Sequence, residues 1–169
     1  MRRILLAAAL AISAGCAGER PLLARSWIIG RPLDLGVVNL AGEPVAVGGP
    51  DDHVRAVVLW ATWCRSCFQL FPALDVLATG DAARGLAVHA ISVDEDLEKV
   101  REALPRIPPR VRVLWDRGAE RLGERLGVEE LPTVLILDRH GVVRHVHEGA
   151  DEDVVRQIDR EVGRLLRER

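Results

Sequence analysis

A pair of cysteines lies between a strongly apolar segment and a segment with helical periodicity, and this order constrains the fold more than any other feature. Residues 54–60 (VRAVVLW) are almost continuously apolar, which is typical of a strand buried on both faces of a sheet. Cys64 and Cys67 follow within a few positions, and residues 65–79 then repeat leucine at helical spacing, with a kink expected at Pro72. A strand that leads directly into a helix predicts an α/β fold with Cys64 at the N-terminus of that helix.

The rest of the chain continues this alternation of strands and helices. Gly42 separates two short apolar runs within residues 37–47, as in a β-hairpin. Strands are expected at 85–93, 111–115, 133–138 and 142–147, and helices at 94–104, 118–128 and 151–168. This order of elements predicts a central sheet that is covered on both faces by helices.

The first 15 residues have the layout of a signal peptide. Arg2 and Arg3 precede an apolar run that is too short to span a membrane, and small residues follow it. We therefore expect a signal peptide at 1–15, a tether at 16–32 and one domain at 33–168. A buried N-terminal helix is the alternative interpretation of the apolar run.

Cys16 follows small residues in a way that resembles the lipobox of bacterial lipoproteins. Ala14 and Gly15 match that pattern, whereas Ser13 stands where leucine is usual. The resemblance implies lipidation of Cys16, and cleavage by an ordinary signal peptidase is the alternative. Both routes export the chain to a periplasmic or membrane-anchored, extracytoplasmic location, where disulfide chemistry persists.

Charge and hydropathy limit the partners of the chain. The net charge is −2, and no basic stripe is interleaved with aromatic residues, which excludes nucleic acid as an expected partner. Beyond the signal peptide no apolar run is long enough to cross a bilayer. We expect a monomer that contacts a membrane only through a lipid on Cys16.

The setting of the cysteine pair predicts thiol chemistry. A helix N-terminus lowers the pKa of a thiol, and the positive charge of Arg65 acts in the same direction, so we expect Cys64 to be a reactive thiolate. Cys67 lies one turn further along the helix, close enough to form a disulfide with Cys64 and to resolve a mixed disulfide. A zinc site is the alternative, but zinc normally needs four ligands and no second Cys-X-X-Cys exists.

Several motifs together resemble the thioredoxin-like proteins. Residues 63–67 (WCRSC) resemble the WCxxC motif, and Pro72 corresponds to the proline in the helix that follows it. Residues 131–133 (LPT) resemble the cis-proline loop, and residues 138–141 (DRHG) the hairpin after it. Cys64 and Pro132 are 68 positions apart, and the additional strand and helix between them resemble the TlpA/ResA branch of extracytoplasmic oxidoreductases.

This resemblance implies a mixed sheet with an N-terminal hairpin and an inserted β-α unit, and it implies roles for individual residues. Cys64 and Cys67 would carry the exchange without a dissociable cofactor or a metal. The substrate-binding residues would be Trp63, Leu131, Pro132 and Thr133, and the residues that tune the pair would be Arg65 and Ser66. The partners would be protein thiols or disulfides and an upstream redox partner, and the ResA-type resemblance points to the haem-site cysteines of apocytochrome c.

The chain departs from the family at the position of the acid that handles the proton of the second cysteine. Val58 and Leu70 stand where thioredoxins and ResA-type proteins carry Asp and Glu. Asp94, Glu129 and Glu130 are alternative proton carriers, although a plain surface carboxylate is the simpler interpretation of each. The motif is compatible with both reduction and oxidation of a protein substrate.

Two other functions that occur on a similar fold fit the sequence less well. A Sco-like copper chaperone would use the cysteine pair with a distant histidine, and His145 and His147 share one face of an expected strand. That class uses CxxxC, however, and a solvated edge strand is the simpler interpretation of the two histidines. A peroxidase of the peroxiredoxin type would need Thr at the position of Ala61.

Overall fold

The computed structural model describes residues 27–120, 122, 126 and 130–168. The expected signal peptide, Cys16 and most of the expected helix at 118–128 therefore lie outside the described residues. Residues 27–32, at the end of the expected tether, lie against the domain. The backbone N–H of Gly30 donates to the carbonyl of Val143, and the N–H of Val143 donates to the carbonyl of Arg31.

Seven strands form one mixed sheet in the order β2-β1-β5-β4-β3-β6-β7. The strands are β1 (Asp34–Val38), β2 (Pro44–Gly48), β3 (Val54–Trp60), β4 (Leu86–Ser92), β5 (Arg112–Trp115), β6 (Thr133–Leu137) and β7 (Val143–Glu148). The β3–β4 and β4–β5 pairs are parallel, whereas β6 runs antiparallel to β3. The expected N-terminal hairpin is present as β1 and β2, and the mixed α/β sheet is confirmed.

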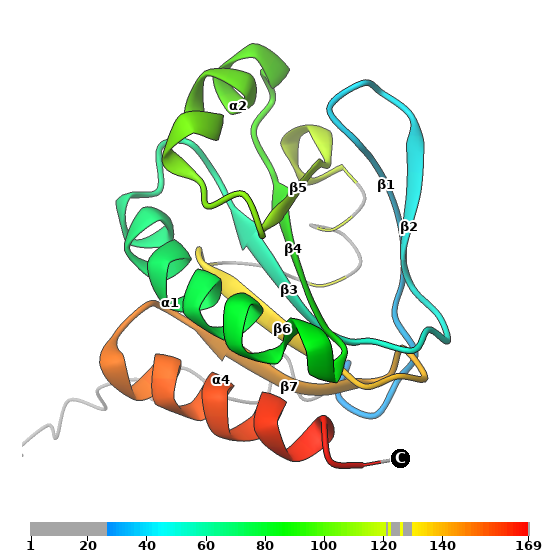
Figure 1. Cartoon of the computed structure of the whole chain (residues 1–169). Helices are drawn as coiled ribbons and strands as arrows, with labels where there is room; N and C mark the ends of the chain where they lie inside the picture. Colours follow the sequence, from blue (N-terminus) through cyan, green and yellow to red (C-terminus); the bar gives the residue numbers. More distant parts are fainter. Residues whose placement is uncertain (1–26, 121, 123–125, 127–129, 169) are drawn as a thin grey trace, which may run out of the picture.

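Three α-helices are described: α1 (Arg65–Asp81), α2 (Leu97–Ala103) and α4 (Glu152–Leu165). Helices α1 and α4 lie side by side against one face of the sheet (Figure 1). Helix α4 buries Ile158, Val162 and Leu165, as its amphipathic pattern predicts. Pro72 lies inside α1.

The central strand β3 is buried along its whole length and contributes to two apolar clusters. Val54, Ala56, Val58 and Trp60 belong to the cluster that also contains the buried residues of α1 and α4. Val57 and Leu59 belong to the second cluster, with residues of β1, β2, β6 and Leu122. Because side chains alternate along a strand, an uninterrupted apolar run supplies both cores at once.

Helix α2 begins three residues later than its acidic first turn suggests. Its N-cap is Asp96, whose carboxylate accepts a hydrogen bond from the backbone N–H of Glu98 at 3.0 Å. Asp94 lies outside the helix, and its carboxylate binds Thr62 and Ser92 instead. In the part of the chain that the structure covers, no helix has the length and apolar character needed to cross a membrane.

Candidate active site

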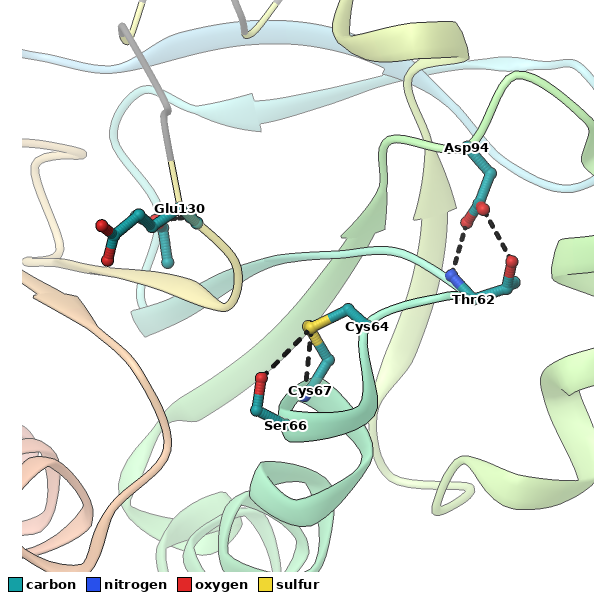
Figure 2. The surroundings of a disulfide bond; sticks show 7 residues. Thr62, Cys64, Ser66, Cys67, Asp94 and Glu130 are labelled. Atoms are coloured by element: carbon teal, nitrogen blue, oxygen red, sulfur yellow. Dashed lines mark hydrogen bonds between the residues drawn. A yellow bond between two sulfur atoms is a disulfide. The ribbon is translucent and has the colours of Figure 1, made fainter.

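Cys64 and Cys67 form a disulfide at the junction of β3 and α1, with an S–S distance of 2.03 Å. Cys64 is the N-cap residue of α1, and its Sγ accepts a hydrogen bond from the backbone N–H of Cys67 at 3.2 Å. The hydroxyl of Ser66 lies 3.5 Å from the same sulfur (Figure 2). Both groups can donate to a thiolate, so in the reduced protein they would stabilise negative charge on Cys64.

The two cysteines differ in their access to solvent. Cys64 keeps 6% of its surface exposed, whereas Cys67 is completely buried. Cys67 belongs to the apolar cluster that contains Trp60, Leu70 and Phe71. A reactant that approaches from solvent therefore meets the sulfur of Cys64 first.

Aromatic side chains pack between the end of β3 and the N-terminal half of α1. Trp60 packs edge-to-face on Phe68 and Phe71, with ring centroids 5.7 and 5.4 Å apart. The guanidinium of Arg106 lies 3.6 Å from the ring centroid of Phe68. Trp60 ends β3 and the two phenylalanines lie in α1, so this packing fixes the strand relative to the helix that carries the disulfide.

The expected cis-proline loop is present, with a cis peptide bond between Leu131 and Pro132. Thr133 begins β6 and pairs with Leu59 near the C-terminal end of β3. Its hydroxyl donates to the carbonyl of Glu130 at 2.7 Å. The cis bond therefore lies at the same end of the sheet as Cys64.

Trp63 has 73% of its surface exposed next to the disulfide. It borders an open hollow of about 680 Å³, whose lining residues are Thr62, Trp63, Val93, Asp94, Glu95, Asp96, Lys99, Gly118 and Ala119. Arg65 is also exposed, and Ser66 is half-buried. The reactive turn is thus surrounded by accessible side chains although the sulfur atoms are largely covered.

The structure corrects the expectation that Asp94 is a surface carboxylate. Asp94 is buried, with 5% of its surface exposed, and it accepts hydrogen bonds from Thr62 and from the hydroxyl of Ser92. The contact with Thr62 could not be predicted, because Thr62 is 32 positions away in the sequence. Only the fold brings the two together, so no local pattern marks the pair.

The other positions that could contribute to proton transfer differ in their burial. Val58 and Leu70 are completely buried in the cluster that contains Cys67, so apolar atoms occupy the places of the family acids. Glu130 is exposed, as expected, and Figure 2 draws it on the other side of the disulfide from Asp94. Glu129 lies outside the described residues.

The interpretation of His145 and His147 as part of a solvated strand is wrong. Strand β7 is an edge strand, but α4 covers these side chains, and only 9% of the surface of His147 is exposed. Both rings pair with Glu161 of α4, at 3.1 Å from His145 and 2.5 Å from His147. Among the described residues, no group of three or more His, Cys, Asp or Glu side chains is arranged to hold a metal ion.

Comparison with known proteins agrees with this geometry. The model of the Redoxin family matches residues 33–162. The chain belongs to the Redoxin family. It is a thioredoxin-like thiol-disulfide oxidoreductase of the DsbE/ResA type, with Cys64 and Cys67 as its cysteine pair.

Three members of this group illustrate the similarity. The thiol:disulfide interchange protein DsbE of Yersinia pestis is 30% identical over 145 residues, which cover 83% of this chain and 74% of DsbE. The thioredoxin-like protein YneN of Bacillus subtilis is 27% identical, over 69% of this chain and 68% of YneN. Among solved structures, a DsbE protein from Chlorobium tepidum has a TM-score of 0.70 at 24% identity, over 79% of this chain and 94% of that chain, which supports the fold.

Proposed function

We propose that this oxidoreductase exchanges disulfides with protein substrates outside the cytoplasm, with Cys64 as the attacking and Cys67 as the resolving cysteine. One observation carries the assignment of roles. Cys64 is the N-cap residue of α1 and keeps some exposure, whereas Cys67 is buried beneath it. A substrate sulfur can reach the first cysteine from solvent, and the second can act only after a mixed disulfide has formed.

The exchange takes two balanced steps when the chain acts as a reductant. The thiolate of Cys64 attacks one sulfur of a substrate disulfide, which forms a mixed disulfide and releases the other substrate sulfur as a thiolate. Cys67 then loses its proton and attacks Sγ of Cys64, which forms the disulfide seen in the structure and releases the second substrate thiolate. Two electrons pass from the dithiol to the substrate. Oxidation of a substrate dithiol is the same sequence reversed.

The residues around the pair would orient the substrate. In this proposal the backbone of Leu131 pairs with an extended peptide, and Pro132 and Thr133 face its cysteine. The location of the cis bond at the Cys64 end of the sheet supports this role. The exposed Trp63 would contact the same peptide, while Arg65 and Ser66 would favour the thiolate. The dithiol is itself the electron carrier, so the proposed reaction uses no dissociable cofactor.

Export and anchoring belong to the same proposal. The signal-peptide layout of residues 1–15 supports export, and the lipobox-like sequence before Cys16 supports lipidation. Labelling of wild type with a radioactive fatty acid, and loss of the label in Cys16→Ala, is the expected result. Unlabelled wild type would show that the chain is not a lipoprotein.

We propose apocytochrome c as the substrate, with reduction of its haem-site cysteines as the reaction. The support is the similarity to the ResA-type branch, carried by WCRSC, the distal cis-proline and the intervening strand and helix. Deletion of the gene should lower the content of covalent c-type haem, and added dithiothreitol should restore it. Normal haem content in the deletion strain would exclude this substrate.

The exchange reaction itself is tested by reduction of insulin with dithiothreitol as electron donor. Wild type should accelerate precipitation of the insulin chains, and Cys64→Ser should fall to the uncatalysed rate. A redox titration against glutathione then gives the direction, since potentials on this fold range from about −270 to about −120 mV. Equal rates for wild type and Cys64→Ser would contradict the proposed role of Cys64.

A further inference from the structure

The loop between β3 and α1 is bound by a buried carboxylate just beyond the end of β4. Oδ2 of Asp94 accepts a hydrogen bond from the backbone N–H of Thr62 at 2.9 Å, and Oδ1 accepts one from the hydroxyl of Thr62 at 2.7 Å. Figure 2 shows the carboxylate directed at Thr62, with Cys64 further along the loop. Thr62 lies two positions before Cys64, so these bonds restrain the segment that leads to Cys64 at the start of the helix.

Asp94 is itself held rigidly. Its Oδ2 also accepts from the hydroxyl of Ser92 at 2.7 Å, and its backbone carbonyl accepts from the indole N–H of Trp115 at 2.7 Å. The N–H of Gly118 donates to the same carbonyl at 3.2 Å. Burial of a carboxylate is costly unless donors replace its water, and here three neutral donors do so, two on Thr62 and one on Ser92.

The ends of the loop are fixed by backbone bonds. The carbonyl of Trp60 accepts from the N–H of Val93 at 2.9 Å, and the carbonyl of Ala61 accepts from the N–H of Cys64 at 3.0 Å. Thr62 lies between these points, and both of its donors bind Asp94. The two bonds therefore connect the middle of the loop to the buried end of β4.

We propose that Asp94 is a positioning residue for disulfide exchange, acting through Thr62 to keep Cys64 at the N-terminus of α1. The inference rests on the proposed exchange function. In the reduced protein the thiolate of Cys64 is stabilised only while its sulfur stays within reach of the N–H of Cys67 and the hydroxyl of Ser66. Loosening the loop weakens both interactions, which destabilises the thiolate and shifts the thiol-disulfide equilibrium towards the disulfide.

A direct electrostatic effect of Asp94 would have the opposite sign. A carboxylate near a thiolate disfavours the negative charge on sulfur, so removal of the charge alone would make Cys64 more acidic. Loss of a positioning contact makes Cys64 less acidic. Thr62→Val separates the two, because it removes the hydroxyl and leaves the carboxylate in place.

The test compares Thr62→Val and Asp94→Asn with wild type in the full chain. The pH dependence of Cys64 alkylation is followed by peptide mapping, and the thiol-disulfide equilibrium is measured against glutathione. Both variants should move the alkylation midpoint to higher pH and shift the equilibrium towards the disulfide by about three- to tenfold, a tenfold change being about 30 mV. Thr62→Ser keeps the hydroxyl and should keep the wild-type values.

Asp96→Asn is the matched control, because it removes a carboxylate two positions away while Asn still caps α2. It should leave both measurements unchanged. A lower alkylation midpoint in Asp94→Asn, with Thr62→Val unchanged, would overturn positioning in favour of a charge effect. Wild-type values in both folded variants would overturn it as well. A wild type that reduces neither insulin nor glutathione disulfide would instead refute the exchange function.

Discussion

The sulfur of Cys64 lies within reach of two donors that differ in strength. The backbone N–H of Cys67 is fixed by the helix at 3.2 Å, whereas the hydroxyl of Ser66 lies further away, at 3.5 Å. Ser66 is one of the two residues between the cysteines, and its hydroxyl can donate to a thiolate. A residue without a side-chain donor at this position could not supply that interaction.

Replacement of Ser66 by alanine should make the thiol of Cys64 less acidic. A hydrogen bond to a charged acceptor contributes up to a few kcal/mol, and at this distance we expect a loss of about 1 kcal/mol of thiolate stabilisation, which raises the pKa of Cys64. Thiolate absorbance as a function of pH in the reduced protein measures the change. An unchanged midpoint would show that the hydroxyl does not bind the thiolate.

His89, in β4, makes the stability of the fold depend on pH. Burial, reinforced by Arg112 and Arg55, lowers the pKa of His89 to about 4. In the unfolded chain the imidazole titrates near 6.5, so between these values the unfolded state binds the additional proton and stability falls as the pH falls. Above the unfolded pKa the histidine is neutral in both states and the penalty is absent.

We expect His89 to cost the wild type about 3 kcal/mol of unfolding free energy between pH 7 and pH 4. His89→Gln does not titrate and should lack this part of the loss. Urea unfolding of both proteins at the two pH values measures the difference, and other titrating groups cancel in the comparison. Parallel losses in the two proteins would show that the pKa of His89 is not lowered in the folded state.

The hairpin between β6 and β7 depends on Gly141, which packs against the backbone of the turn at Gly49. Gly141 has φ +76°, and a Cβ at this position would lie 2.4 Å from the backbone oxygen of Gly49. Gly42, in the turn between β1 and β2, has φ +86° with open space around it. The two glycines therefore share the unusual conformation and differ in the close contact.

Gly141→Ala should destabilise the protein by about 3 kcal/mol or more, because it adds a backbone clash to the cost of positive φ. Gly42→Ala should cost only about 1 kcal/mol, from the conformation alone. Urea unfolding of both variants tests this difference. Equal losses would mean that the hairpin and the 49–50 turn shift apart easily.

The elements next to the cysteines could be predicted from sequence because their signals are local. A seven-residue apolar run, a cysteine pair and leucines at helical spacing are contiguous, and β3 and α1 are present as expected. The cis bond at Pro132 could also be predicted, because residues 131–133 (LPT) resemble the cis-proline loop of the family. The pairs Asp94–Thr62 and His147–Glu161 could not be found in this way, because their partners are 32 and 14 positions apart and meet only after folding.

At the scale of the whole molecule, the sheet brings three separate segments to one end. The turn after β3 carries Cys64, the residues after β4 carry Asp94, and the loop before β6 carries the cis-proline. Parallel strands β3 and β4 place their C-terminal ends together, and antiparallel β6 brings its N-terminal end to the same edge. The topology of the sheet therefore brings the residues of the site together. The burial of Cys67 depends on its position in α1 and on the aromatic side chains that pack around that helix.

Trapping of the mixed disulfide distinguishes the attacking cysteine, which we propose to be Cys64, from the resolving cysteine, Cys67. Reduced Cys67→Ala, incubated with a protein disulfide and mapped by mass spectrometry, should accumulate a covalent complex through Cys64 that dithiothreitol reverses. Reduced Cys64→Ala should accumulate none, because Cys67 is completely buried. A complex that forms through Cys67 in Cys64→Ala at the same rate would contradict the assignment of Cys64 as the attacking cysteine.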